Sequence, residues 1–201
     1  MEQKGLLLVL SGPSGCGKGT MVKELISREG QIEVSRSATS RAPREGEVDG
    51  LHYDFVSRER FEEMIKNGEV LEYTQYNGNY YGTQKAQVET MLASGKDVIL
   101  EIETEGAMNI RRAFADAVLV FVVPPSFQVL RQRLIGRGTE SMEVIEDRLA
   151  IAKKELSLAE QYDYLVVNGQ LETAVWEVES IIVAEKRKVL RNIEMVRSLL
   201  S

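Results

Sequence analysis

The sequence is poor in features that several classes of protein require. It has one cysteine in 201 residues, so it can form no internal disulfide, and a reducing compartment such as the cytoplasm is expected. Its apolar run near the N-terminus, residues 6–10, is too short to span a bilayer and lacks the cleavage site of a secretory signal. The formal net charge is -6 and the pI is about 5.1, which gives no support to general nucleic-acid binding. Any anion site must therefore be built locally.

The composition is that of an ordinary folded protein. Hydrophobic residues make up 43% of the chain and charged residues 28%. This length can bury a sizeable core, and one domain with mobile subdomains is expected.

Buried apolar runs alternate with helical patterns along the chain. The runs predict strands at 6–10, 97–101, 117–123 and 164–167. Helical spacing predicts helices at 20–27, 107–114, 127–135, 143–160 and 172–199. Such alternation predicts an α/β fold in which helices cover both faces of a mainly parallel sheet.

Residues 33–83 interrupt this rhythm. Short β-like pieces are expected at 31–37, 53–56, 70–76 and 79–82, with one helix at 58–66. Asn77-Gly78 between two of the pieces is a two-residue hairpin signal. We interpret 33–83 as a small mixed insertion on a core made of 1–32, 84–125 and 160–201. Residues 126–159, with a Gly-containing loop at 136–139, are interpreted as a lid.

A phosphate-binding loop lies between the first strand and the first helix. Its candidate ATP-binding residues are Gly12, Pro13, Ser14, Gly15, Cys16, Gly17, Lys18, Gly19 and Thr20. A Gly-rich turn lets several N–H groups converge on phosphate oxygens, and Lys18 adds a mobile positive charge. The alternative, a Gly-rich turn without a ligand, is disfavoured by the flanking strand and helix.

Two positions in this loop need separate interpretation. Gly19 stands where the general motif has Ser or Thr, so Mg²⁺ is expected to be held mainly by phosphates and water, with Thr20 as a candidate ligand. Cys16 is interpreted as a small packed residue rather than a redox switch.

An arginine-rich segment in the insertion is a candidate second anion site. Arg41 and Arg44 flank Ala42-Pro43 in an expected extended segment, where two guanidinium groups can grip a phosphate. A solvated surface pair is the alternative.

At this point the chain resembles the guanylate kinases, relatives of other nucleoside monophosphate kinases. The resemblance covers essentially the whole chain. It depends most on the segments 37–47 (SATSRAPREGE), 79–83 (NYYGT) and 136–140 (GRGTE).

The resemblance implies which residues bind GMP. Arg41, Arg44, Tyr53 and Tyr81 would hold its phosphate, and Ser37, Glu72 and Thr83 would read its guanine. Independently of the family, a carboxylate such as Glu72 can accept bonds from guanine N1–H and its exocyclic amine, which adenine cannot reproduce. A solvated strand residue is the alternative for Glu72.

The chain departs from the family pattern after the strand at 97–101. Glu101 and Glu103 stand where an Asp pair is usual. By resemblance, Glu103 would help to read guanine, and Glu101 would lie near the metal and phosphates.

The lid supplies further arginines. By resemblance, Arg137 and Arg148 would close onto the ATP phosphates as catalytic groups beside Lys18 and Arg41, and Asn168 would lie near adenine. Arg131 and Arg133 either join them or form a solvated helix face, and Asn168 is otherwise a turn residue.

The implied reaction transfers the γ-phosphoryl group of ATP to GMP, and to dGMP, with Mg²⁺. The acceptor is an anionic phosphate, so no general base is expected, and alignment and charge cancellation supply catalysis. The competing interpretations are a non-catalytic guanylate-kinase-like interaction module and a P-loop kinase acting on AMP, dTMP or a sugar. A homodimer through the C-terminal helix is an alternative to packing of that helix on its own sheet.

Overall fold

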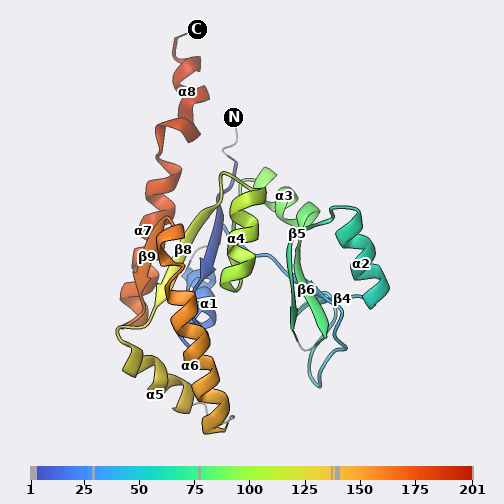
Figure 1. Cartoon of the computed structure of the whole chain (residues 1–201). Helices are drawn as coiled ribbons and strands as arrows, with labels where there is room; N and C mark the ends of the chain where they lie inside the picture. Colours follow the sequence, from blue (N-terminus) through green and yellow to red (C-terminus); the bar gives the residue numbers. More distant parts are fainter. Residues whose placement is uncertain (1–3, 29, 77, 137, 139–140, 201) are drawn as a thin grey trace.

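The chain folds around two β-sheets of different size (Figure 1). The computed structural model describes residues 4–28, 30–76, 78–136, 138 and 141–200. Within these ranges, none of the helices is long and apolar enough to cross a membrane.

The larger sheet contains β1 (Leu7–Ser11), β2 (Ile32–Val34), β7 (Asp97–Glu101), β8 (Val118–Val123) and β9 (Tyr164–Val167). Its order is β2-β7-β1-β8-β9, and every neighbouring pair is parallel. The parallel sheet predicted from the apolar runs is thus confirmed. The first predicted strand, β1, is the central strand of the sheet. The loop that directly follows β1 therefore lies at the middle of the sheet's carboxyl edge.

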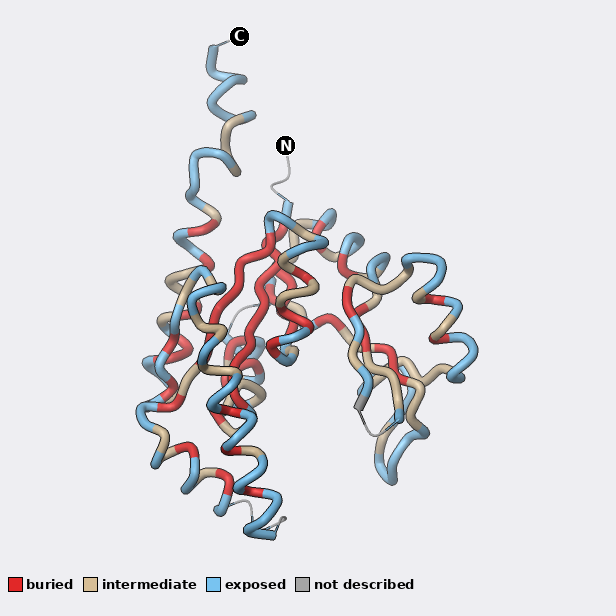
Figure 2. The backbone as a smooth tube through the Cα atoms, in the orientation of Figure 1, coloured by how far each residue is buried: buried red, intermediate tan, exposed pale blue. Residues whose placement is uncertain are grey.

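Helices cover both faces of this sheet. Helices α1 (Lys18–Arg28) and α7 (Leu171–Lys186) pack on the face that contains Leu8 and Leu10. Helices α3 (Lys85–Ala93) and α4 (Thr104–Ala113) pack on the face that contains Leu7 and Val9. Alternate residues of β1 enter opposite clusters because successive side chains point to opposite faces of a strand. The central strands β1, β7 and β8 are therefore the most buried part of the molecule (Figure 2).

The smaller sheet forms the mixed insertion expected from the sequence. It contains β3 (Ser37–Thr39), β4 (Asp54–Phe55), β5 (Val70–Tyr76) and β6 (Asn79–Gln84) in the order β4-β3-β6-β5. Helix α2 (Arg58–Lys66) packs on it through Phe61 and Met64. Tyr76 pairs with Asn79, as the predicted hairpin requires; Asn77 lies outside the described residues.

Helices α5 (Phe127–Gly136) and α6 (Met142–Leu156) form the segment interpreted as a lid, followed by the short helix η1 (Ala159–Gln161). They share a small core that includes Leu130, Leu134, Ile145 and Leu149. Most of the loop at 136–140, including Arg137, lies outside the described residues.

Three sequence interpretations need correction. The piece expected at 31–37 is divided, because β2 joins the large sheet and β3 the small one. Helix α3 was not expected, since Val88 and Leu92 are its only fully buried residues and give a weak pattern. The helix expected at 172–199 is interrupted: α7 ends at Lys186, and η2 (Val189–Asn192) and α8 (Ile193–Ser198) follow.

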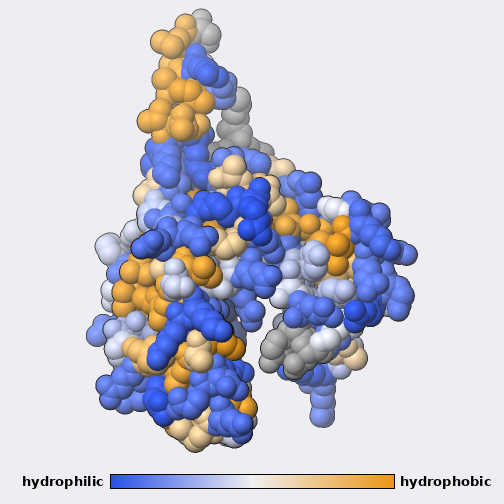
Figure 3. Space-filling view, in the orientation of Figure 1, coloured by the Kyte–Doolittle hydropathy of each residue, from blue (hydrophilic) through white to orange (hydrophobic). Residues whose placement is uncertain are grey.

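Helix α7 ends close to the point where the sheet beneath it ends. A helix of 16 residues is about 24 Å long, whereas a strand of six residues spans only about 20 Å. Beyond Lys186, therefore, the chain has left the sheet that α7 covers. Apolar side chains of the last segment, among them Leu190, Leu199 and Leu200, are exposed (Figure 3).

Candidate nucleotide-binding site

The predicted phosphate loop lies between the carboxyl end of the central strand β1 and the start of α1. Gly12, Gly15 and Gly17 have φ angles of 135°, 92° and 91°, which favour glycine. A Cβ on Gly12 would lie 2.2 Å from the carbonyl oxygen of Val122. The glycines thus meet a backbone requirement of the loop.

Lys18 lies along the loop that precedes it. Its Nζ donates to the carbonyl oxygens of Gly12, at 2.6 Å, and of Pro13, at 3.2 Å. These acceptors hold the ammonium group beside the N-terminus of α1, where a polyphosphate would be favoured.

Cys16 is fully buried in the core beneath the loop. Burial raises the pKa of its thiol, although the nearby Lys18 acts in the opposite direction. A reactive thiolate needs a lowered pKa, so this environment agrees with Cys16 as a small packed residue.

Asn168 and Arg133 tie the loop to distant parts of the chain. The side-chain amide of Asn168 donates to the carbonyl oxygen of Cys16 at 2.8 Å. Arg133 of α5 donates to the same carbonyl oxygen at 3.2 Å and to that of Asn168 at 2.8 Å. The sequence left Arg131 and Arg133 undistinguished, but Arg131 pairs with Glu146 at 2.5 Å instead.

Helix α6 also reaches the loop. Arg148 Nη1 lies 3.0 Å from Ser14 Oγ, which accepts its hydrogen bond. The expected neighbourhood of Arg148 and the loop is thus present, whereas Arg137 lies outside the described residues.

A second cleft, of about 320 Å³, opens between the small sheet and the carboxyl end of β7. Figure 3 shows the molecule hollowed between its two parts on this side. The cleft is lined by six of the predicted site residues: Ser37, Tyr53, Glu72, Tyr81, Glu101 and Glu103. Residues spread over 67 positions of the sequence, from 37 to 103, therefore line the same cleft.

Glu72 is the buried acid of this cleft. Glu72 is only 5% exposed, and its Oε1 accepts a hydrogen bond of 2.7 Å from the hydroxyl of Thr83. Thr83 pairs across the sheet with both Glu72 and Ser37, so three predicted guanine-reading residues are neighbours. Burial raises the pKa of Glu72, Thr83 lowers it, and Glu103 raises it further.

Gly106 of α4 was not singled out by the sequence, although it contacts this acid. A Cβ at position 106 would lie 2.8 Å from Glu72 Oε2. Side chains essentially never approach so closely, so the carboxylate of Glu72 can occupy this place because residue 106 is glycine. Little in the sequence signalled this role, because Gly106 lies just before the helix predicted at 107–114 and falls inside α4 only in the structure.

Arg41 lies beside the cleft, and its guanidinium group packs near two aromatic rings. Its guanidinium carbon lies 5.4 Å from the centre of the Tyr53 ring and 5.7 Å from that of Phe55. Glu47 and the Tyr81 hydroxyl raise its pKa. Arg44 is exposed and donates its main-chain N–H to Glu47 Oε2 at 2.7 Å.

Glu101 joins the two halves of the site. It lines the cleft, and its carboxylate oxygens lie 3.4 Å from the position that a Cβ on Gly19 would occupy. Although Glu101 is exposed by surface area, partial desolvation raises its pKa, and Lys18 and Lys23 lower it. Thr20 is exposed on the first turn of α1. The described residues contain no cluster of three or more His, Cys, Asp or Glu side chains fit for a metal.

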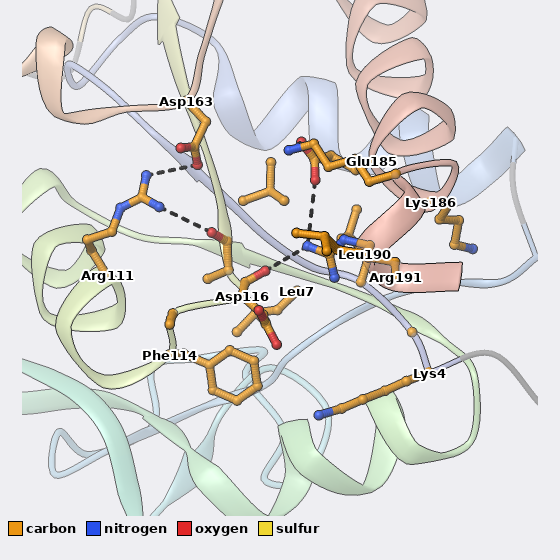
Figure 4. Close-up of a pocket in the computed structure, with 16 residues that line it drawn as sticks. Lys4, Leu7, Arg111, Phe114, Asp116, Asp163, Glu185, Lys186, Leu190 and Arg191 are labelled. Carbon is orange, nitrogen blue, oxygen red and sulfur yellow. Dashed lines mark hydrogen bonds and ion pairs between the residues drawn. The ribbon is translucent and has the colours of Figure 1, made fainter. Parts of the chain in front are cut away.

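A larger pocket, of about 420 Å³, lies at the opposite end of the sheet strands (Figure 4). Several charged side chains in its lining contact one another or a backbone carbonyl oxygen. Arg111 contacts Asp163 at 2.8 Å, Lys188 contacts Glu185 at 2.5 Å, and Arg191 donates to the carbonyl oxygen of Asp116 at 2.9 Å. Arg191 attaches the C-terminal segment to the core, and the pocket lies away from the phosphate loop, so it is not a candidate for the chemistry.

The architecture sorts the chain into a class. Many proteins have a phosphate loop after a central parallel strand, but here a separate small sheet carries a second polar cleft that meets the loop at Glu101. This combination defines a P-loop kinase with an acceptor-binding insertion.

Comparison with known proteins gives the particular family. The sequence model described as "Guanylate kinase" matches residues 4–185. Guanylate kinases of Halalkalibacterium halodurans and Listeria monocytogenes serotype 4b are 50% and 49% identical, over 98% and 100% of this chain and 97% and 98% of theirs. The crystal structure of guanylate kinase from Anaplasma phagocytophilum superposes with a TM-score of 0.75 at 33% identity, covering 95% of this chain and 91% of that one. The chain belongs to the guanylate kinase family.

Proposed function

We propose that the protein transfers the γ-phosphoryl group of ATP to GMP, and to dGMP, giving ADP and GDP in purine nucleotide metabolism. One observation carries the choice of acceptor. The buried Glu72–Thr83 pair lies in the cleft that meets the phosphate loop at Glu101. A buried carboxylate can accept hydrogen bonds from guanine N1–H and from the exocyclic amine of guanine. Adenine has no donor at N1, so with adenine the buried carboxylate would lack a hydrogen-bond partner.

The proposed ATP site is the phosphate loop. The backbone N–H groups of residues 14–20 and the ammonium of Lys18 receive the polyphosphate, and Asn168 lies near adenine. The contact of Arg148 with Ser14 and the bridge made by Arg133 support a role for α5 and α6 over the loop. Arg137 is assigned to the same group by family resemblance.

The proposed GMP site is the 320 Å³ cleft. Ser37, Glu72, Thr83 and Glu103 read the base, and Arg41, Arg44, Tyr53 and Tyr81 hold the phosphate. Arg41 supports this assignment through its Nε, which is buried and has no hydrogen-bond partner among the described residues. Such a donor is costly unless a ligand supplies an acceptor.

Catalysis then depends on alignment and charge rather than on proton transfer. The acceptor phosphate is already anionic, so the chain needs no base. Lys18, Arg41, Arg137 and Arg148 would hold the donor and acceptor in line and reduce negative charge on the transferring group. Closure of residues 33–83 and 126–159 over the core would exclude water and so prevent hydrolysis of ATP.

Magnesium fits the residues at this junction. A carboxylate and a hydroxyl are the oxygen donors that Mg²⁺ prefers, and Glu101 and Thr20 supply them near the loop. Because the described residues provide no complete cage, phosphates and water would complete the coordination. When bound, the metal would supply charge neutralisation between the phosphates.

Two further statements stay predictions. The single cysteine, Cys16, favours a reducing compartment, so we expect the protein to act in the cytoplasm. The second prediction is a homodimer, and sedimentation velocity of the full chain tests it.

The experiment that tests the function is a coupled assay of ADP release. Purified protein with ATP and Mg²⁺ is offered GMP, dGMP, AMP and dTMP in turn. We expect turnover with GMP and dGMP and little with AMP or dTMP. Turnover favouring AMP or dTMP would indicate another P-loop kinase, and turnover with none would indicate a non-catalytic interaction module.

A further inference from the structure

Glu47 makes a two-pronged ion pair with Arg41. Arg41 Nη1 lies 2.8 Å from Glu47 Oε2, and Nη2 lies 2.9 Å from Oε1. Arg41 Nη1 also donates to the carbonyl oxygen of Ala42 at 2.8 Å. The two side chains expose only 13% and 19% of their surface, so the pair is partly shielded from solvent.

The shape of the guanidinium group gives this pairing a direction. A guanidinium has five N–H donors in one plane, divided between an end edge, formed by Nη1 and Nη2, and a side edge, formed by Nε and Nη2. Glu47 occupies the end edge. The side edge includes the buried Nε, which makes no hydrogen bond among the described residues, and the hydroxyl of Tyr81, another predicted phosphate ligand, lies near the same guanidinium.

Local sequence places Glu47 where it can do this. The N–H of Glu47 donates to the carbonyl oxygen of Arg44 at 3.0 Å, which closes a turn over residues 44–47. Gly46, at the third position of the turn, has φ of 81°, a conformation that other residues rarely adopt. The turn brings Glu47 back to Arg41, and the N–H of Arg44 fixes Oε2 at 2.7 Å.

We propose that Glu47 is a positioning residue that holds the end edge of Arg41, so that the side edge faces the phosphate of the bound nucleoside monophosphate. This proposal rests on the proposed function. The aromatic rings of Tyr53 and Phe55 flank the same guanidinium and limit its movement in other directions. Because Glu47 also cancels the charge of Arg41, its contribution is orientation rather than attraction.

An opposite role would produce the opposite result. If Glu47 were a stand-in for the phosphate, the nucleotide would have to displace it, and removing it would tighten binding. If Glu47 is a positioning residue, removing it frees a side chain with many rotamers, and ordering that side chain then opposes binding. The sign of the change in GMP affinity therefore distinguishes the two roles.

The test measures the binding of GMP and guanosine to the full chain by calorimetry, with steady-state KM values for GMP and ATP. For Glu47→Ala we expect the Kd for GMP to rise about tenfold, which corresponds to about 1.4 kcal/mol. Guanosine lacks the phosphate, so its affinity should change less than twofold, and the KM for ATP should stay within about twofold. A disrupted fold would impair guanosine binding as well.

Three variants complete the design. Glu47→Gln keeps one acceptor and should fall between wild type and Glu47→Ala. Glu45→Ala removes an exposed acid from the same turn and should bind GMP as wild type does. In an Arg41→Ala background, Glu47→Ala should have little further effect, because its target is gone.

Unchanged or tighter binding of GMP by both Glu47 variants would overturn the proposal. Failure of the wild-type chain to bind GMP would instead overturn the proposed function, so the two failures are distinguishable.

Discussion

The two substrate sites are built from different parts of the polypeptide. The phosphate loop is formed mainly by backbone, with three glycines at positive φ and a lysine held by carbonyl oxygens. The cleft on the small sheet is formed by side chains, with a buried carboxylate, a hydroxyl and tyrosine rings. A backbone site binds the phosphates that all nucleotides share, whereas a side-chain site can distinguish one base from another.

This contrast predicts that changes in the loop reduce turnover with every acceptor. Lys18→Ala should lower kcat by on the order of 10²–10³-fold, as does the removal of a charge-stabilising donor in other enzymes. The assay is steady-state turnover with saturating GMP and then dGMP, and Lys85→Ala, on the surface of α3, is the control. Near-normal kcat would remove Lys18 from the catalytic group.

Changes at the phosphate end of the cleft should separate the two substrates. Arg41→Ala should raise the KM for GMP on the order of 10–100-fold, because it removes charge-assisted hydrogen bonds, while the KM for ATP stays within about threefold. Arg60→Ala, on the exposed face of α2, is a matched control. A larger effect on ATP than on GMP would exchange the two site assignments.

Changes at the base end should alter selectivity more than speed. Glu72→Gln keeps an acceptor for Thr83 but gains donors, so the ratio of kcat/KM for GMP to that for AMP should fall on the order of tenfold. Glu89→Gln, on exposed α3, should leave the ratio unchanged. The base-reading role fails if the ratio for Glu72→Gln equals that of wild type.

The same variant has a pH signature. Because burial raises the pKa of Glu72 in the folded chain, its protonated form stabilises the fold below the unfolded pKa of about 4.3, and this contribution is lost as pH rises through the folded pKa. Glu72→Gln resembles the protonated form, so its Tm advantage over wild type should be small at pH 4 and larger at pH 7.5. Thermal melts of both proteins across this pH range measure the difference in Tm. A difference that becomes smaller as pH rises would contradict the predicted direction.

The smallest effect is expected where the cleft depends on a missing side chain. Gly106→Ala would bring a Cβ within 2.8 Å of Glu72 Oε2, so the carboxylate must move, and the KM for GMP should rise about three- to tenfold. Alanine favours helices over glycine by about 1 kcal/mol, which offsets part of the strain and should keep the Tm close to that of wild type. Gly30→Ala has open space around its Cβ and is the control. An unchanged KM for GMP would show that the Glu72 carboxylate can move aside without loss of GMP binding, and would contradict this role of Gly106.

The backbone-built parts were the ones that the sequence predicted well. The strands at 97–101 and 164–167 and the loop at 12–18 follow from local apolar runs and glycine spacing, and the structure confirms the strands. Such features depend on residues that are neighbours in the chain, which is what a sequence pattern records.

The parts that sequence could not supply depend on contacts between distant residues. The bridge from Arg133 to Asn168, the space that Gly106 leaves for Glu72 and the return of Glu47 to Arg41 have no periodic pattern. The end of α7 at Lys186 has no nearby glycine or proline to signal it in the sequence. The assignment of Ser37, Glu72 and Thr83 to one site came from family resemblance, and the roles of these residues stay predictions.

The small sheet is joined to the core by two adjacent stretches of chain. The hydroxyl of Ser35, where the chain leaves the core, and the N–H of Arg36 both lie 3.1 Å from Oε1 of Gln87, just after the chain has returned. Exit and return thus share one side-chain amide. A cut at each of these points should therefore excise the acceptor-binding unit and leave ends near enough for a short bridge. The unit could then be exchanged for that of a relative. The transplanted unit would bring its own counterparts of Ser37, Glu72 and Thr83, whereas Glu103 and Gly106 would stay with the core.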